Sequence, residues 1–119
     1  MPSERSILWF RDIVDNIDRI QGYIHGMTEQ EFLADHKTID AVDRCLARIS
    51  EAAVRLGKEA EELCGQIPWH DIRGIGNRLR HSYETIVPAR IWFTVQRDLD
   101  PLRRACESVI ANAPDANQS

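Results

Sequence analysis

The sequence predicts an all-α protein: an up-and-down bundle of four main helices with one extra short helix. Apolar residues recur at intervals of three and four along nearly the whole chain, which is the spacing of one helix face. No segment alternates in the manner of a half-buried strand, and no internal repeat is present. Because 119 residues are the size of one domain, we expect a single domain over residues 1–112 and a polar flexible tail over residues 113–119.

Two helices are predicted in the first third of the chain. An apolar stripe from Ile7 to Ile24 indicates a first helix over about residues 3–23. Thr28 and Glu31 then form the capping-box pattern, in which each side chain bonds the backbone of the other residue. This pattern predicts a short helix that ends near Ala34.

The longest periodic segment runs from Thr38 to Cys64. Its apolar residues alternate steps of three and four over about four heptads, which indicates a long helix packed at a shallow angle against antiparallel neighbours. Since the stripe continues past Gly57, we expect the helix to continue there as well, and to end at Gly65 and Pro68.

Two further helices complete the prediction. One spans about Trp69 to His81, and the last begins near Pro88, a residue suited to the first helical position. Pro101 lies within the apolar pattern of that last helix, so we expect a kink at about residues 98–100.

A cluster of positive charge lies between Arg73 and Tyr83. This stretch holds three arginines, an asparagine, a histidine and a tyrosine but no acid, although the chain has a net charge of −4. Concentrated positive charge in an acidic protein indicates a site for a phosphate, and the histidine supplies a group that titrates near neutral pH. We therefore predict phosphate binding or phosphate chemistry in this segment.

Helical spacing brings several of these residues together. Asn77 and His81 are four residues apart and share a face, which Arg78 and Arg80 flank, while Tyr83 follows near the helix end. Such groups suit metal-free cleavage of RNA, which needs a proton acceptor, a proton donor and a cation beside the phosphorane. Because one histidine does not easily serve as base and acid at once, we predict a homodimer whose two-fold axis brings two copies of His81 into one cleft.

The segment Ile67–Tyr83, Ile-Pro-Trp-His-Asp-Ile-Arg-Gly-Ile-Gly-Asn-Arg-Leu-Arg-His-Ser-Tyr, resembles the HepT-like HEPN-domain toxins, the partners of MntA-type minimal nucleotidyltransferase antitoxins. The likeness covers nearly the whole chain, including the final helix with its Asp98–Leu102 segment. It implies a HEPN-like bundle, a homodimer and a metal-independent endoribonuclease that cleaves RNA at the dimer cleft. It also implies that the antitoxin silences the toxin by transferring AMP to Tyr83.

The family motif matches this sequence at most of its positions. Asn77, Arg78 and His81 stand where the resemblance wants catalytic residues, and Arg78 with Arg80 would bind the RNA phosphates. The motif arginine five residues before the histidine is replaced by Gly76.

Two interpretations of that replacement stay open. Arg73, eight residues before the histidine, is a candidate to supply the missing charge, as are Arg78 and Arg80. Alternatively, the protein is a catalytically decayed module that serves as a non-enzymatic docking or substrate-binding partner of a nucleotidyltransferase. A third interpretation is a helical dimer that only joins partners.

Other features have ordinary explanations. We expect no metal or cofactor, since no histidine follows a glutamate at the spacing of a di-metal bundle, and three cysteines without a C-x-x-C pair indicate buried thiols. The acidic run Glu59, Glu61 and Glu62 is interpreted as a solvated face, and the three tryptophans as core or dimer-interface anchors. No apolar run approaches the roughly 18 residues of a membrane span, so we expect a cytoplasmic protein.

Overall fold

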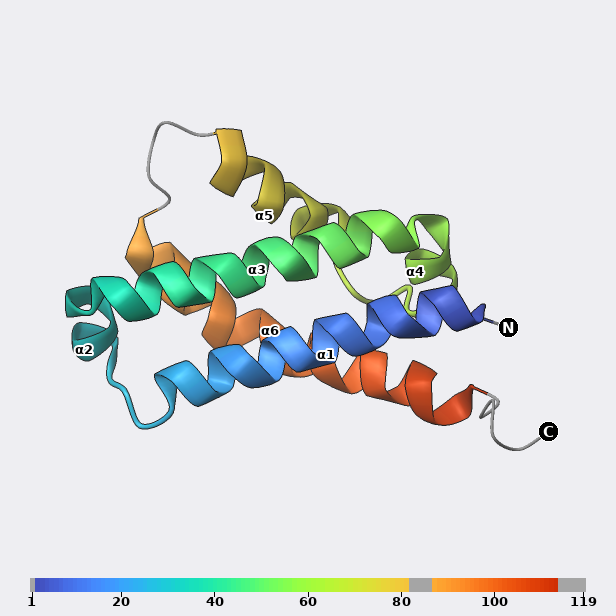
Figure 1. Ribbon diagram of the computed structural model, residues 1–119, viewed down its shortest axis with the longest axis horizontal. Helices are drawn as coiled ribbons and strands as arrows, with labels where there is room; N and C mark the ends of the chain where they lie inside the picture. The colour runs from blue at the N-terminus through green and yellow to red at the C-terminus, as the bar shows by residue number, and fades with distance from the viewer. Residues whose placement is uncertain (1, 82–86, 114–119) are drawn as a thin grey trace.

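The computed structural model describes residues 2–81 and 87–113, and the side chains of Arg80 and His81 are not among the described parts. These residues form helices and no strand, which confirms the all-α prediction. The helices are α1 (Glu4–Ile24), α2 (Glu29–Ala34), α3 (His36–Leu56), α4 (Lys58–Leu63), α5 (Trp69–His81) and α6 (Pro88–Asn112) (Figure 1).

Side-chain caps explain where the first three helices begin. The hydroxyl of Ser3 accepts a hydrogen bond from the Ser6 N–H at 3.1 Å and so opens α1. Both halves of the predicted capping box of α2 are present: Thr28 Oγ1 accepts from the Glu31 N–H, and Glu31 Oε1 accepts from the Thr28 N–H. Asp35 accepts from the N–H and hydroxyl of Thr38 at the start of α3, and these bonds lower the pKa of its carboxyl.

The expectation of one unbroken helix from Thr38 to Cys64 was wrong. Gly57 adopts φ +58°, a left-handed conformation that ends α3, and its N–H donates to the carbonyls of Ala53 and Val54. A separate short helix, α4, follows directly. The apolar period continued because Ala60 of α4 is also buried, so periodicity alone did not reveal the break.

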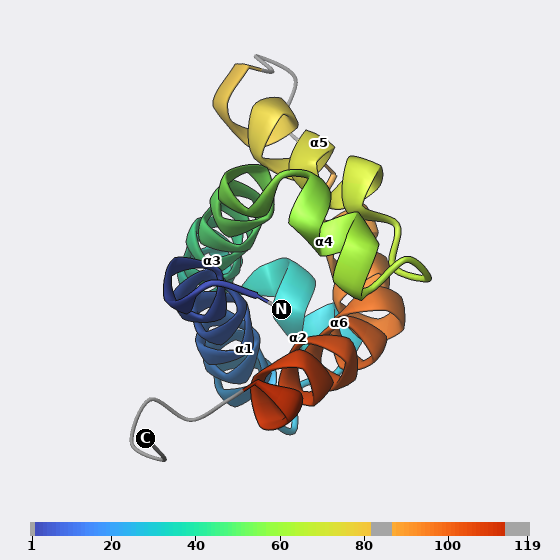
Figure 2. The same cartoon turned by 90° about the vertical axis from the view of Figure 1, so that its right-hand side faces the viewer.

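The long helices lie side by side around one core. Helix α1 packs against α3 on one side and α6 on the other, α5 packs on α3 at the edge of the bundle, and α2 contacts α3 and α6 at one end (Figures 1 and 2). The core comprises apolar side chains from all six helices, among them Phe10, Ile13, Ile17, Phe32, Val42, Ile49, Ala60, Trp69, Val95 and Leu102. All three cysteines are buried and free, as predicted.

Trp69 anchors the start of α5. Its side chain is buried, its indole N–H donates to the carbonyl of Cys64 at 2.9 Å, and its ring meets that of Phe10 edge to face at 6.5 Å. Trp92 and Trp9 are only partly buried, the first against Phe32 and the second beneath the guanidinium of Arg55.

Helix α6 continues through Pro101 without interruption, and Pro88 stands in its first turn as expected. The predicted kink stays a prediction, since continuity of the helix does not decide it. Residues 114–119 of the predicted tail lie outside the described residues.

Candidate functional site

Helix α5 is fixed on α3 by a buried serine. The hydroxyl of Ser50 donates to the carbonyl of Arg73 at 2.8 Å and accepts from the N–H of Gly76 at 3.0 Å. Ser50 is 0% exposed and Gly76 is buried as well. One hydroxyl thus joins two backbone groups in the middle of α5, which sets how the helix lies along α3 and which of its sides faces outward.

The outward side of α5 is the one that holds the predicted site. Asn77 and Arg78 are both exposed, and His81 is the last residue of the helix. Residues three and four apart are neighbours on a helix, so Asn77 and Arg78 both lie one turn before the position of His81. Tyr83 lies outside the described residues, as do the side chains of Arg80 and His81.

Gly76 occupies the position of the expected motif arginine, and that position is turned toward α3 rather than outward. Gly76 is buried, and its N–H donates to the hydroxyl of Ser50 on α3. The glycine therefore has a packing role at the crossing of two helices, because a residue without a side chain lets α5 approach the hydroxyl of Ser50 closely.

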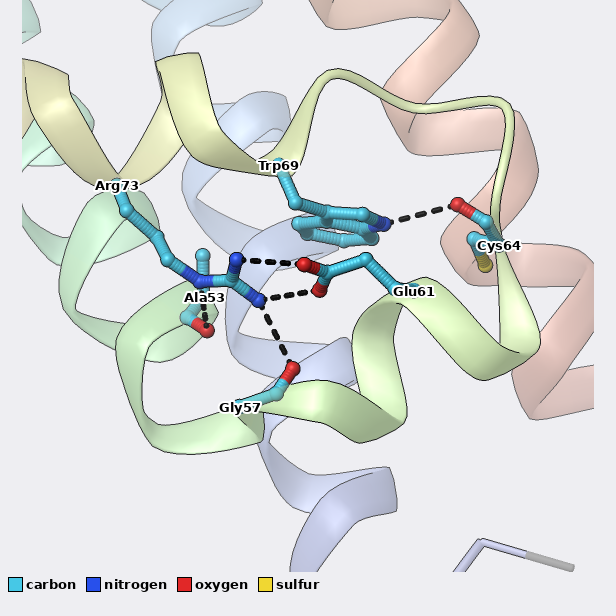
Figure 3. Close-up of polar contacts among 6 residues, drawn as sticks. All are labelled: Ala53, Gly57, Glu61, Cys64, Trp69 and Arg73. Atoms are coloured by element: carbon cyan, nitrogen blue, oxygen red, sulfur yellow. Dashed lines mark hydrogen bonds and ion pairs between the residues drawn. The ribbon is translucent and has the colours of Figure 1, made fainter.

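The guanidinium of Arg73 is occupied by other partners (Figure 3). Its Nε donates to the carbonyl of Ala53, its Nη2 to the carbonyl of Gly57, and both terminal nitrogens to the carboxylate of Glu61 at 2.9 and 2.6 Å. The paired carboxylate raises the pKa of Arg73, and the same hydrogen bonds lower the pKa of Glu61. Arg73 thus satisfies carbonyls at the end of α3 and holds α4 against α5, and we do not retain it among the catalytic candidates.

Two residues of the acidic run, Glu59 and Glu61, make defined contacts with other helices and do not only face solvent. Besides Glu61 on Arg73, Glu59 accepts a hydrogen bond from the hydroxyl of Ser6 and so links α4 to α1. Sequence reasoning missed both contacts because their partners lie on other helices, 12 and 53 residues away. No periodicity or local spacing reports such pairs.

A groove of about 240 Å³ lies between α5 and α6, with α3 contributing to its floor. We call it the α5–α6 groove. Its floor is apolar and includes Leu46, Ile72 and Ile75. Its rim holds three arginines, two aspartates and one aromatic residue: Arg78, Arg90, Arg97, Asp71, Asp98 and Phe93. Of these residues, only Arg78 was predicted as a site residue from the sequence. Arg90, Phe93 and Arg97 recur at helical spacing on α6, and this spacing could have shown them as a second stripe beside the buried one.

Residues 2–81 and 87–113 contain no cluster of three or more histidine, cysteine or carboxylate side chains that could hold a metal ion. None of their helices combines the length and apolar character that crossing a bilayer requires.

These features define a class of protein: a small all-α bundle with a basic segment that ends in histidine on an outer helix. A family model described as "Ribonuclease HepT-like" matches residues 13–109. The chain belongs to this family.

Curated relatives of similar length support the assignment. The chain is 29% identical over 101 residues to "Probable ribonuclease HepT" of Thermococcus cleftensis, which covers 85% of this chain and 92% of that protein. It is 26% identical over 110 residues to "Putative RNase MJ1216" of Methanocaldococcus jannaschii, and the matched residues cover 92% of this chain and 91% of that protein. It is 34% identical over 92 residues to "Putative RNase MJ0127" of the same organism, and the match covers 77% of this chain and 76% of that protein. No solved structure matches the chain significantly.

Proposed function

We propose that this protein is a metal-independent endoribonuclease, and that its active site is formed around the C-terminal end of α5 in a homodimer. The observation that supports this most directly is the outward side of α5, where exposed Asn77 and Arg78 lie one turn before His81 in a chain of the HepT-like ribonuclease family. The names of the relatives, which refer to ribonucleases, point to the same substrate class.

In the proposed reaction the 2′-hydroxyl of RNA loses its proton and attacks the adjacent phosphorus. The 5′-oxygen of the next nucleotide leaves and gains a proton, so the products are a 2′,3′-cyclic phosphate and a 5′-hydroxyl. One His81 accepts the first proton and its symmetry mate donates the second, each contributing on the order of 10²–10⁴-fold. Arg78, with Arg80, stabilises the charge that develops on the phosphorane, and Asn77 orients the phosphate.

Arg78 takes the part of the missing motif arginine in this proposal. It is exposed, it lies one turn from His81, and no ion pair with a carboxylate engages it among the described residues. Arg73 is already bound to Glu61 and two carbonyls, so it is a poor source of the same charge.

The proposal extends to regulation. We infer that the protein is the toxin of a HepT/MntA-type toxin–antitoxin system in the cytoplasm, and that the partner nucleotidyltransferase attaches AMP to Tyr83. In that step the tyrosine oxygen attacks the α-phosphorus of ATP, pyrophosphate leaves and the phenol loses its proton. Because Tyr83 follows His81 by two residues, the added phosphate would compete with RNA for Arg78 and Arg80.

The test is cleavage of a fluorescent single-stranded RNA by purified protein in EDTA. Wild type should release cyclic-phosphate ends, His81→Ala should be slower by at least about 100-fold, and Arg78→Ala by a similar factor. Arg55→Ala, which removes an exposed arginine elsewhere on α3, is the matched control and should cut normally. Equal inactivity of wild type and His81→Ala at high protein concentration would contradict the nuclease proposal.

A second candidate function follows from Gly76. Because the motif arginine is absent and its position faces α3, the same structure also fits a catalytically decayed module that only presents Tyr83 to a nucleotidyltransferase. Incubation with such an enzyme and labelled ATP distinguishes the two. Labelling of wild type but not of Tyr83→Phe, without RNA cleavage by either protein, would favour the module.

A further inference from the structure

The α5–α6 groove is open, small and mixed in character. Its volume of about 240 Å³ is below the range of about 300–1,000 Å³ that encloses a drug-sized molecule. Apolar side chains from α3 and α5 line the floor, and three guanidinium groups stand at the rim. This geometry suits part of an extended ligand that passes along a surface better than a small molecule that is enclosed.

Charge at the rim favours a phosphate-bearing ligand. Arg97 is paired with the neighbouring carboxylate of Asp98 through two hydrogen bonds, at 2.7 and 2.9 Å. In contrast, Arg78 and Arg90 make no ion pair with any carboxylate of the described residues. Asp71 is the remaining acid among the described residues of the groove, so Arg78 and Arg90, which have no ion pair within that part of the chain, leave it net positive in a chain whose overall charge is −4.

Phe93 gives the groove an aromatic surface. Phe93 is 56% exposed, which is unusual for phenylalanine, and the guanidinium of Arg97 lies over its ring, 4.8 Å from the ring centroid, so that the aromatic ring and the planar cation together offer a stacking surface. An exposed aromatic ring beside arginines is the arrangement that holds unpaired bases, because every base has a face that stacks on such a ring. Residues 90, 93 and 97 repeat at helical spacing, so these groups extend along about 10 Å of α6.

The groove leads to the proposed active site. Arg78 lines the groove and is also the residue one turn before His81 on the outer side of α5. A strand that follows Arg90 and Phe93 along α6 and then passes Arg78 therefore arrives at the end of α5 that holds the histidine.

We propose that the α5–α6 groove binds single-stranded RNA beside the scissile phosphate, with a base stacked on Phe93 and phosphates on Arg78 and Arg90. This inference rests on the proposed ribonuclease function and specifies the form of its substrate. Paired RNA is excluded as the preferred ligand because bases inside a duplex do not present a free face to an aromatic side chain.

The experiment uses full-length protein with His81→Ala, so that RNA is bound without being cut. Fluorescence anisotropy compares a labelled 12-nucleotide RNA with its duplex, over 50–200 mM salt. When Phe93→Ala is added to the His81→Ala protein, single-strand binding should weaken by about 5- to 100-fold, whereas Phe93→Trp in the same background should retain it. Added Arg90→Ala should weaken binding and reduce the salt slope by about 0.7.

Controls keep this result separate from folding and from assembly. Added Arg55→Ala and Leu8→Ala remove an exposed arginine and an exposed apolar side chain on α3 and α1, and both should bind RNA normally. The mass of each variant in solution is also measured by sedimentation. Weaker RNA binding at unchanged mass supports the groove, whereas a fall in mass that accompanies the loss would make the groove an interface between copies of the chain and overturn the proposal.

The two proposals fail in different ways. If wild type cuts RNA but the Phe93 and Arg90 variants bind RNA like the controls, the groove proposal is wrong and the ribonuclease proposal stands. If the groove variants lose RNA binding while wild type cuts nothing, the groove proposal holds and the nuclease proposal is lost. Equal or tighter binding of duplex RNA would also contradict the groove proposal.

Discussion

Arg73 illustrates how a single residue changes meaning between sequence and structure. In the sequence it belongs to the basic cluster and lies two helical turns before His81. In the folded chain it is a connector that bonds two carbonyls at the end of α3 and the carboxylate of Glu61. Arg78, only five residues later, keeps its charge exposed.

We predict opposite effects of removing these two arginines. Arg73→Ala removes the guanidinium hydrogen bonds to the carbonyls of Ala53 and Gly57, each of which keeps one backbone donor, and should lower the free energy of unfolding by about 1–2 kcal/mol. Arg78→Ala should change the free energy of unfolding by less than about 0.5 kcal/mol while slowing cleavage by about 100-fold. Urea unfolding and RNA cleavage measure the two quantities. If Arg73→Ala is fully stable yet inactive, Arg73 is catalytic after all.

Glu61 gives the Arg73 contact a pH dependence. The pKa of Glu61 is lowered in the folded protein, mainly because its carboxylate accepts hydrogen bonds from Arg73. The contact therefore stabilises the fold at pH values above the ordinary glutamate pKa, and this stabilisation is lost as pH falls through the lowered pKa. The stability difference between wild type and Arg73→Ala should therefore narrow at acidic pH. A difference that stays constant down to pH 3 would mean that the carboxylate contributes nothing.

Asp43 gives a second prediction, with the opposite sign. Its Oδ1 is buried with no hydrogen-bond partner in the described part of the chain, and burial, followed by the charge of Asp40, raises its pKa to about 6. The folded state resists ionisation, so this residue costs stability progressively from about pH 4 to pH 6, and the cost is complete above pH 6. Asp43→Asn should therefore be more stable than wild type by about 1–2 kcal/mol at pH 8, which is less than the full pKa shift would give because Asp43 is only partly buried and solvent screens its charge.

The same two proteins should converge in stability as pH falls well below 3.8, the ordinary aspartate pKa, because the aspartate is then protonated in both the folded and unfolded states. Thermal unfolding across pH 2.5–8 measures this. Asp40→Asn, at an exposed position one turn earlier, is the control and should give a smaller gain in the same direction. A gain for Asp43→Asn that does not change with pH would rule out ionisation as the cause.

At the scale of elements, the contact between α3 and α5 fixes the side of α5 on which we propose the active site. Ser50 bonds the middle of α5, and the residue that faces it is Gly76. The replacement of the motif arginine is thus part of how these two helices pack, in addition to being a change in the site.

Two glycines on α5 provide a matched pair for this interpretation. An arginine at Gly76 would have to enter the buried contact with Ser50, so Gly76→Arg should cost about 3 kcal/mol or more and should not increase cleavage. A Cβ built at Gly74 meets nothing within 4 Å, so Gly74→Arg should be neutral or slightly stabilising. Thermal unfolding compares them, and a stable Gly76→Arg protein with increased cleavage would show a dormant site instead.

At the scale of the whole molecule, the proposed mechanism needs two chains. If each cleft uses one His81 from each subunit, mixed dimers that contain one His81→Ala subunit should be inactive. Co-refolding wild type with an equal amount of His81→Ala should then leave about one quarter of the activity, because only dimers of two wild-type chains cut. Independent sites would leave one half, and cleavage by a protein that sediments as a monomer would contradict the dimer itself.

The sequence by itself determined the class of fold, most helix boundaries, the cap of the short second helix and the location of the basic segment. These features depend on local chemistry: the period of apolar residues, the capping box of Thr28 and Glu31, and the charge of residues 73–83. The tertiary structure decided what each charge does. It assigned Arg73 to Glu61, turned Gly76 toward α3, broke the long helix at Gly57 and brought Arg90 and Phe93 of α6 beside Arg78. Those contacts join residues on different helices, and the packing of the helices, rather than any local spacing, sets the distances between them.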